Sequence, residues 1–361
     1  MKKKYDVALV VGTRPNFVKA APLLKYFEEN NLNTLFIHTG QHKDKNMSTD
    51  IFDDLSIRPP DIVLETPTVN MNEQLSYMLE ALDGVFNENE IKMVGVFGDV
   101  TSTLAAALST KNKKLELFHV EAGLRSRNME MPEERNRIIV DSISDYLFAP
   151  SYDAVENLID ENIDEDKIFS VGNIMIDTLT SNYEKIKSKT NKIKKNLNIK
   201  NEYFVTTIHR PSNLTDENLN NIFTAFQNFT QEYSVILPAH PRLKKYIDEN
   251  HIELNNVALI DPLSYIDFLS LVNGSTLVLT DSGGLQEETT FMNINCLTLR
   301  NETERPITVE LGTNKIVGLN TENIISEINK SLTSKLPNEI KIENWDGRTS
   351  ERIYNILIKK L

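Results

Sequence analysis

The sequence predicts an α/β protein built from two doubly wound parallel-sheet domains. Short apolar runs typical of buried strands alternate with helix-forming segments along almost the whole chain. The alternation pauses at a Lys- and Asn-rich helix and then restarts, and 361 residues are enough for two domains of ordinary size. We therefore expect one domain over residues 1–173 and a second over residues 174–348. A C-terminal helix, about 349–361, is placed to pack back on the first domain.

The first half of the chain predicts strands connected through helices. Compact apolar runs predict strands at Asp6–Val11, Thr34–His38, Ile62–Leu64, Met93–Phe97, Leu115–Val120, Tyr146–Ala149 and Ile168–Val171. Apolar residues at helical spacing, or a high alanine content, predict helices after Pro15, at Met47–Leu55, at Met71–Phe86, after Thr103, from Glu133 to about Ile143, at Tyr152–Ile159 and at about Ile174–Leu197. Strands joined in this way pair in parallel, with helices on both faces of the sheet.

The second half repeats the pattern. Strands are predicted at Phe204–Ile208, Ser234–Leu237, Val257–Ile260, Ser275–Thr280, Ile294–Leu299 and Lys315–Gly318, and helices at Thr215–Asn228, at Ser264–Asn273, from Leu285, at Glu322–Leu332 and at Ser350–Lys360. Polar residues recur after strands in both halves, at Arg14, Asp99, Glu121, His209 and Asp281. Ligands of open parallel sheets bind at the carboxyl ends of the strands, so we expect the two edges to face each other across a ligand cleft.

Composition excludes several classes of protein. A hydrophobic content of 40% with 25% charged residues fits a globular protein. The formal net charge of −13 disfavours nucleic-acid binding. The single cysteine, Cys296, rules out a disulfide framework or a cysteine-based metal cluster and is expected to be buried in a strand. The absence of a signal peptide and of a membrane-spanning apolar run predicts a cytoplasmic protein with no membrane contact.

Neither a metal nor a cofactor is predicted. His38 with His42, and His119 with Glu121, are pairs that do not complete a ligand set for a metal ion. The sequence has no G-x-G-x-x-G motif, so a nicotinamide cofactor is not expected either.

One stretch, residues 281–305, has the features of half a nucleotide site. A buried strand is followed by Ser282, Gly283 and Gly284, which we interpret as a tight turn before a helix that opens at Leu285. Glycines let a ligand approach the backbone, and a helix N-terminus attracts phosphate. Glu287 and Glu288 are expected in the first turn of that helix, where a carboxylate suits ribose hydroxyls, and Arg305 adds a cation. A Ser-Gly-Gly turn alone is equally consistent with a simple connection.

Nine motifs in order make the chain resemble the non-hydrolysing UDP-N-acetylglucosamine 2-epimerases. They are GTRPNFVK at Gly12, TGQH at Thr39, GDVTST at Gly98, HVEAGLR at His119, PEERNR at Pro132, GN at Gly172, HRPSN at His209, DSGGLQEE at Asp281 and TERP at Thr303. The resemblance implies two Rossmann-like domains in the GT-B architecture, a cell-surface polysaccharide precursor as product, and a homodimer. It also implies interconversion of UDP-GlcNAc and UDP-ManNAc by anti elimination of UDP, through 2-acetamidoglucal, and syn re-addition.

The resemblance also assigns roles to residues. Asp99, Glu121 and Glu133 match the acidic catalytic positions, which handle the C2 proton and stabilise positive charge at C1, and His209 helps UDP to leave. The residues that match substrate-binding positions are Arg14, Lys19, Ser282, Gly283 and Gly284 for phosphates, Glu288 for ribose, Arg305 near both, and Leu263 and Phe268 for uracil.

Structural interpretations compete with these roles. Spacing alone also fits Asp99 as a helix N-cap, Glu133 as a first-turn partner of the helix dipole, and Phe268 as helix core. His209 could equally be a strand-end histidine satisfied by backbone groups. At the level of function, the alternatives are a hydrolysing 2-epimerase, an epimerase of a related UDP-2-acetamido sugar, and a GT-B glycosyltransferase or a UDP-sugar-binding module without turnover.

Overall fold

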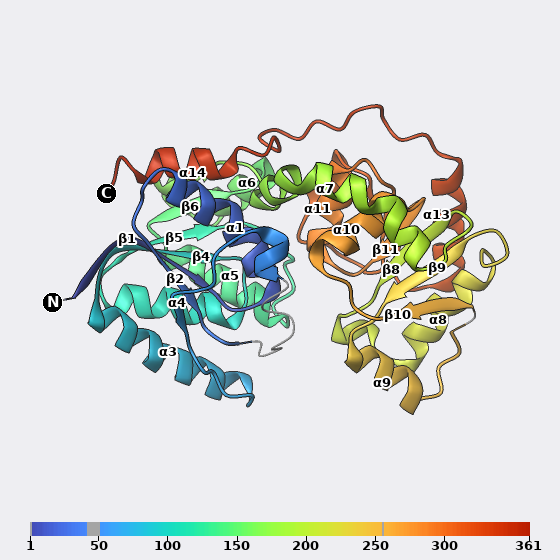
Figure 1. The fold of residues 1–361 in the computed structure, drawn as a ribbon, viewed down its shortest axis with the longest axis horizontal. Coiled ribbons are helices and arrows are strands. Elements are labelled where there is room, and N and C mark those ends of the chain that lie inside the picture. Colours follow the sequence, from blue (N-terminus) through green and yellow to red (C-terminus); the bar gives the residue numbers. More distant parts are fainter. Residues whose placement is uncertain (1, 42–50, 255) are drawn as a thin grey trace. The chain divides into compact units, whose positions relative to one another are not determined.

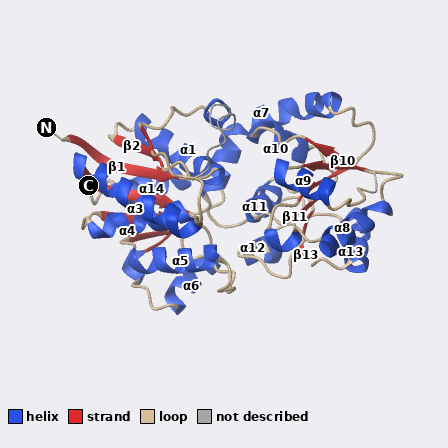
Figure 2. Ribbon diagram, turned by 90° about the horizontal axis from the view of Figure 1, so that it is seen from below, coloured by secondary structure: helices blue, strands red, loops and turns tan. Residues whose placement is uncertain are grey.

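A computed structural model describes residues 2–41, 51–254 and 256–361. The chain divides into two compact units, residues 1–181 with 343–361 (unit 1) and residues 182–342 (unit 2) (Figure 1). Each unit contains one parallel β-sheet with helices on both sides (Figure 2). Among the described residues, none of the helices combines the length and apolar character that crossing a membrane requires.

Unit 1 is built on a sheet of seven strands in the order β3-β2-β1-β4-β5-β6-β7. The strands are β1 (Lys3–Val11), β2 (Thr34–His38), β3 (Ile62–Val63), β4 (Asn89–Phe97), β5 (Glu116–Val120), β6 (Tyr146–Ala149) and β7 (Ile168–Ser170). The helices are α1 (Arg14–Glu29), α3 (Met71–Glu88), α4 (Thr101–Asn112), α5 (Pro132–Ile143), α6 (Tyr152–Asp160), α7 (Ile174–Asn196), which continues into unit 2, and α14 (Thr349–Leu357), and residues 51–55 are also helical. All pairings in the sheet are parallel.

Apolar side chains of the central strands hold helices on both faces of the unit 1 sheet. On one face, buried residues of β1, β2, β4 and β5 form a single cluster with α3, α4 and α5. On the other face, α14 returns from the end of the chain to lie beside α1 (Figure 1), where the Tyr354 ring packs edge-on against Tyr26 at 5.5 Å between centroids. The buried Asp177 carboxylate accepts hydrogen bonds from the backbone N–H groups of Thr349 and Ser350, which fixes the start of α14.

Unit 2 contains a sheet of six strands in the order β10-β9-β8-β11-β12-β13. The strands are β8 (Tyr203–Thr207), β9 (Ser234–Pro238), β10 (Val257–Ile260), β11 (Leu277–Thr280), β12 (Cys296–Thr298) and β13 (Asn314–Ile316). The helices are α8 (Asp216–Gln227), α9 (Pro241–Glu249), α10 (Tyr265–Asn273), α11 (Gly283–Phe291), α12 (Pro306–Glu310) and α13 (Thr321–Thr333). One face packs on α8 and α13 through a large apolar cluster, and on the other face the Tyr203 hydroxyl donates to the Leu271 carbonyl of α10.

The predicted fold class is confirmed: both domains are doubly wound parallel sheets. Cys296 is buried in β12, as expected, and burial raises the pKa of its thiol to about 12. Helices α9 and α12 were not predicted. The helix expected from Leu285 begins at Gly283, so the prediction that Glu287 and Glu288 lie in its first turn is wrong. Residues 47–50 of the predicted helix Met47–Leu55, and His42, lie outside the described residues.

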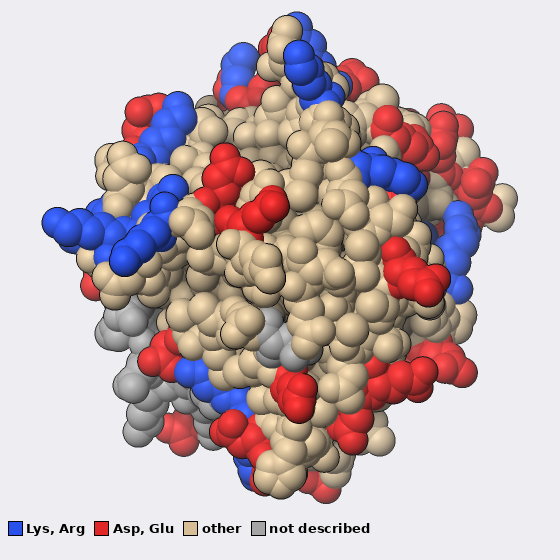
Figure 3. Space-filling view, turned by 90° about the vertical axis from the view of Figure 1, so that its right-hand side faces the viewer, with Lys and Arg blue, Asp and Glu red and all other residues tan. Residues whose placement is uncertain are grey.

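On one face of the molecule the charged side chains of the described residues are dispersed (Figure 3). Figure 3 shows one face of the molecule, on which the described acidic and basic side chains lie scattered and no continuous basic patch is visible. This distribution accords with the net charge of −13.

Candidate active site

Several predicted site residues follow the strands at which the order of each sheet reverses: Arg14 follows β1, Asp99 follows β4, His209 follows β8 and Ser282 follows β11. In unit 1 the order turns between β1 and β4, which are neighbours although β2 and β3 intervene in the chain. In unit 2 the corresponding pair is β8 and β11. The connections that leave such neighbouring strands diverge to opposite faces and open a crevice at the carboxyl ends, which is where doubly wound sheets bind ligands.

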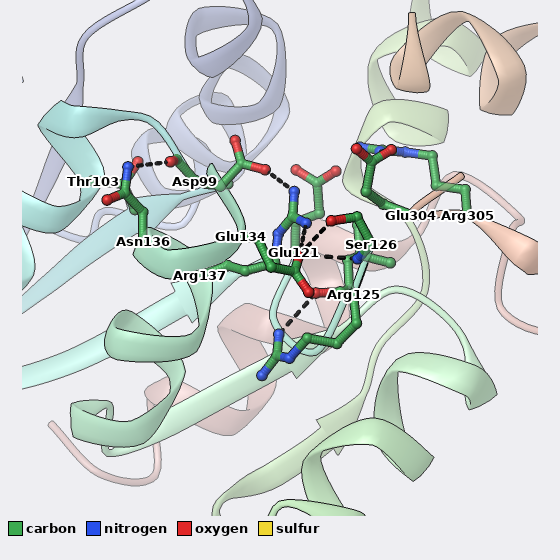
Figure 4. Close-up of polar contacts among 12 residues, drawn as sticks. Asp99, Thr103, Glu121, Arg125, Ser126, Glu134, Asn136, Arg137, Glu304 and Arg305 are labelled. Atoms are coloured by element: carbon green, nitrogen blue, oxygen red, sulfur yellow. Dashed lines mark hydrogen bonds and ion pairs between the residues drawn. The ribbon is translucent and has the colours of Figure 1, made fainter. Parts of the chain in front are cut away.

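Asp99 follows β4 and is held by helix α5. The Arg137 guanidinium forms an ion pair with its carboxylate, and the Asn136 side-chain amide donates to its backbone carbonyl at 2.8 Å (Figure 4). The N-cap of α4 is Val100, so the alternative interpretation of Asp99 as the cap of that helix is wrong. The Asp99 carboxylate therefore points in a defined direction, and 26% of the Asp99 side chain remains exposed.

Glu121 follows β5 and is paired with Lys19 of α1. Both side chains are buried, and they form a close ion pair. The backbone of Glu121 is in the left-handed region (φ 73°), which costs a non-glycine residue about 1–2 kcal/mol and is characteristic of functional sites. Gly98 beside this pair has φ 62°, and a Cβ there would lie only 2.9 Å from the Lys19 Nζ. Lys19, predicted to hold phosphate, therefore lies against a candidate acid.

The two glutamates of the PEERNR motif have different environments. Glu133 is half-buried in the first turn of α5, and no hydrogen bond or ion pair joins its carboxylate to another described residue. Glu134 is fully buried and accepts hydrogen bonds from the backbone N–H groups of Ser126 and Arg127 at 2.9 and 2.8 Å (Figure 4). Burial alone would raise the pKa of Glu134, but these bonds and Arg137 hold it below its ordinary value. Sequence reasoning missed this anchoring role, since two adjacent glutamates carry no signal of which one turns inward.

His209 and Asp281 form a pair at the ends of β8 and β11. The Nδ1 of His209 lies 2.5 Å from the Asp281 Oδ1, and the histidine side chain is 56% exposed while the aspartate is fully buried. Asp281 also accepts from the backbone N–H groups of His209 and Arg210 at 3.0 and 2.9 Å. Burial would raise the pKa of Asp281, but the His209 side chain and these N–H groups outweigh it and keep the pKa low. A buried carboxylate thus orients the ring, and Nε2 is left for a ligand.

The turn before α11 has features that suit an anion. Ser282 is the N-cap of the helix, and Gly283 and Gly284 provide first-turn N–H groups. The Arg305 guanidinium lies against this turn so closely that a Cβ on Gly283 would approach the Arg305 Nη1 to 2.3 Å, which explains the glycine. Buried Glu287 forms an ion pair of 2.9 Å with the Arg305 Nε, so Glu287 holds the Arg305 guanidinium in position.

The remaining candidates lie on or next to α1, α10 and α11. The Glu288 carboxylate accepts a hydrogen bond of 2.9 Å from the buried Tyr265 hydroxyl, a partner that the sequence did not suggest. Leu263 and Phe268 are half-buried just before and within α10. Arg14 is half-buried in the first turn of α1.

Unit 1 thus brings the turn that carries Asp99 next to the Lys19–Glu121 pair, because a Cβ on Gly98 would lie 3.4 Å from the Glu121 Oε2. Unit 2 groups the histidine pair, the glycine turn and Arg305. The first set can move protons on an uncharged group of a substrate, and the second can hold an anionic group and donate to it.

Comparisons with known proteins agree with these features. The chain is 37% identical to the UDP-N-acetylglucosamine 2-epimerase of Methanocaldococcus jannaschii over 97% of this chain and 98% of that protein. It is 35% identical to the UDP-2,3-diacetamido-2,3-dideoxy-D-glucuronate 2-epimerase of Pseudomonas aeruginosa over 98% and 99% of the two chains. Its fold matches the crystal structure of the M. jannaschii UDP-GlcNAc 2-epimerase in complex with UDP-GlcNAc and UDP, with a TM-score of 0.90, 36% identity and coverage of 98% and 99%.

A second solved structure, the UDP-GlcNAc 2-epimerase of Neisseria meningitidis bound to UDP-GlcNAc, matches with a TM-score of 0.88 and 30% identity over 98% of this chain and 100% of that one. The family model described as UDP-N-acetylglucosamine 2-epimerase matches residues 25–358. Sequence, sheet topology and near-complete coverage agree, and the chain belongs to the UDP-N-acetylglucosamine 2-epimerase family.

Proposed function

We propose that this enzyme interconverts UDP-GlcNAc and UDP-ManNAc without hydrolysis, by eliminating UDP to give 2-acetamidoglucal and then adding UDP back at C1 while a proton returns to the other face of C2. The observation that carries the proposal is the Lys19–Glu121 pair beside the turn of Asp99, because it places fixed carboxylates at the ligand-binding edge of unit 1. Relatives of the same length include enzymes named for UDP-N-acetylglucosamine and solved with UDP-GlcNAc.

The chemistry explains why several carboxylates are needed. The C2 proton of the sugar is not acidic, so cleavage of the C1–O bond runs ahead of proton removal and leaves positive charge at C1. In this proposal Asp99, Glu121 and Glu133 share two tasks: they accept and return the C2 proton, and they stabilise the charge at C1. Epimerisation also needs proton delivery to either face of C2, which one carboxylate in one position cannot provide.

The leaving diphosphate has its own set of residues. Ser282, Gly283 and Gly284 would hold phosphate oxygens through the start of α11, with Arg305 supplying positive charge. His209, oriented by Asp281, would donate from Nε2 to the departing UDP and accept the proton back when UDP re-adds.

Other residues are assigned to the nucleoside and to the phosphates. Arg14 and Lys19 would contact phosphate, and Lys19 would do so while it is paired with Glu121. Glu288 would bind the ribose hydroxyls. Leu263 and Phe268 would hold uracil. The homodimer and the cytoplasmic location stay predictions.

Incubating the purified chain with UDP-GlcNAc and separating the products by anion-exchange chromatography tests the proposal. UDP-ManNAc with intact diphosphate supports it. Free ManNAc with UDP indicates the hydrolysing alternative, and unchanged UDP-GlcNAc contradicts both. Glu121→Gln should give no product, whereas Glu116→Gln, at the exposed amino end of the same strand, should keep full activity.

A second substrate is favoured by one observation, the 35% identity to the P. aeruginosa UDP-2,3-diacetamido-2,3-dideoxy-D-glucuronate 2-epimerase over nearly the whole chain. Presenting both UDP-sugars to the enzyme at equal concentration and comparing kcat/KM decides between them. We expect UDP-GlcNAc to be preferred, and a higher kcat/KM for the diacetamido sugar would reassign the substrate.

A further inference from the structure

His119 is a fully buried histidine that the mechanism above does not use. It lies in β5, two residues before Glu121, and its side chain has no exposed surface. Its Nδ1 lies 2.6 Å from the Asp141 Oδ1, and its Nε2 lies 2.8 Å from the carbonyl oxygen of Gly98. Gly98 directly precedes Asp99, so the ring touches the turn that carries one candidate acid and belongs to the strand that carries another.

The Gly98 carbonyl oxygen, which faces Nε2, can only accept a hydrogen bond. The Asp141 carboxylate, which faces Nδ1, is also best satisfied as an acceptor. A carbonyl oxygen has no proton to give, so the Nε2 must carry one. The Asp141 carboxyl could in principle donate to Nδ1, but its other oxygen already accepts from the Gly123 N–H at 3.1 Å and the Arg125 Nη1 at 2.7 Å. Burial would raise the pKa of Asp141, yet His119 and Arg125 hold it below its ordinary value, which favours the carboxylate.

The charges around the ring are consistent with a second positive group. Arg125, in the loop after β5, also binds Glu161 at the end of α6 through hydrogen bonds of 2.7 and 2.6 Å. The two carboxylates Asp141 and Glu161 therefore face one arginine, and a cationic His119 would balance the charge of this group, in which Asp141 is buried and the Glu161 side chain is 30% exposed. Without that proton, a lone pair of the ring would face either a carboxylate or a carbonyl at hydrogen-bond distance, which is unfavourable in a site without water.

We propose that His119 donates from both ring nitrogens, to the Asp141 carboxylate and to the Gly98 carbonyl, and acts as a positioning residue, holding the Gly98 carbonyl and, through it, the direction of Asp99. The positioning role of His119 rests on the proposed function, whereas the presence of a proton on both ring nitrogens does not. The ring joins three segments that carry site residues: the turn after β4, the end of β5 and helix α5. His119 is not expected to touch the substrate.

Nuclear magnetic resonance of the full chain labelled with ¹⁵N-histidine tests the protonation state without any activity. Because both ring nitrogens face acceptors, both should show a directly bonded proton. The signal is assigned by its absence from His119→Gln, or by its change in Asp141→Asn if the first variant does not fold. A single protonated ring nitrogen would overturn the proposal even if the enzyme epimerises UDP-GlcNAc normally.

Kinetics tests the positioning role. His119→Gln should lower kcat at least tenfold and leave the KM for UDP-GlcNAc and the Kd for UDP within about twofold, because His119 forms hydrogen bonds with none of the described residues assigned to UDP. His251→Gln, an exposed histidine after α9, is the matched control and should behave as the parent enzyme. An unchanged kcat, or a loss of UDP affinity that matches the loss of rate, would refute the positioning role. Absence of epimerase activity in the parent enzyme would instead refute the proposed function, and the NMR result would still stand.

Discussion

Replacing Glu304 by glutamine should destabilise unit 2 more than any ordinary surface change. Glu304 is 1% exposed and binds Arg300 through two hydrogen bonds of 2.8 and 3.0 Å and Arg210 through one of 2.9 Å. Arg305, the cation of the glycine turn, also approaches it at 3.7 Å (Figure 4). Glutamine keeps the shape of the side chain, removes its charge, and turns one acceptor into a donor that faces guanidinium donors.

The expected loss follows from burial. Removing one partner of a buried ion pair costs about 3–5 kcal/mol, because the remaining charge is desolvated and unpaired. Arg210 is 23% exposed on its side chain and recovers some hydration, so we expect the lower end, about 3 kcal/mol. For a domain of this size that corresponds to a fall of roughly 6–12 °C in the midpoint of unfolding.

Scanning calorimetry with and without saturating UDP measures this effect. The control is Glu310→Gln at the exposed end of α12, which should change stability by less than about 1 kcal/mol. UDP should still raise the unfolding temperature of Glu304→Gln, because Glu287 continues to hold Arg305. If Glu304→Gln matched the control, the buried charge cluster would not contribute to the stability of unit 2 as its geometry indicates.

Three further predictions follow from the site. Asp99→Asn and Glu121→Gln should each lower turnover by at least a thousandfold while the Kd for UDP by calorimetry stays within about threefold, and near-normal turnover in either would refute the assigned roles. Gly283→Ala should weaken UDP binding at least tenfold because its Cβ would displace Arg305, whereas Gly84→Ala, whose Cβ meets no atom within 4 Å, should bind UDP normally. Stability to urea should fall as the pH drops from about 5 through 4, because carboxyls with lowered pKa stabilise the fold only while ionised; a stability that does not fall over this range would contradict the directions of their shifts. These carboxyls are Glu134, Asp141, Asp281 and Glu304.

The fold could be predicted from the sequence because its strands are short, apolar and separated by amphipathic helices, so that periodicity identifies most elements. Helix α9 escaped because its sequence PRLKKYIDE is short and highly charged, although Leu243, Tyr246 and Ile247 are at helical spacing. Helix α12 has only five residues, which is too short for a periodic pattern to show. The start of α11 was misplaced because glycines suggest a turn, whereas here Gly283 already forms the first helical residue.

The site could be predicted only as a set of residues. Motifs identify Asp99, Glu121 and His209 as candidates, but the partner of each side chain lies far away in the sequence. Lys19 pairs with Glu121 across 102 positions, and Arg137 pairs with Asp99 across 38. Such pairs depend on which strands are neighbours in the sheet and on which way each helix turns its faces. Periodicity does not contain that information.

Solvent deuterium tests the account's central claim most directly. UDP-GlcNAc is incubated with the enzyme in D₂O and followed by proton NMR until the two epimers reach equilibrium. Removal and return of the C2 proton by side-chain carboxylates should place deuterium at C2 of intact UDP-ManNAc, and at C2 of the UDP-GlcNAc that re-forms. Epimerised UDP-sugar that retains its original hydrogen at C2 would contradict the elimination and re-addition of UDP.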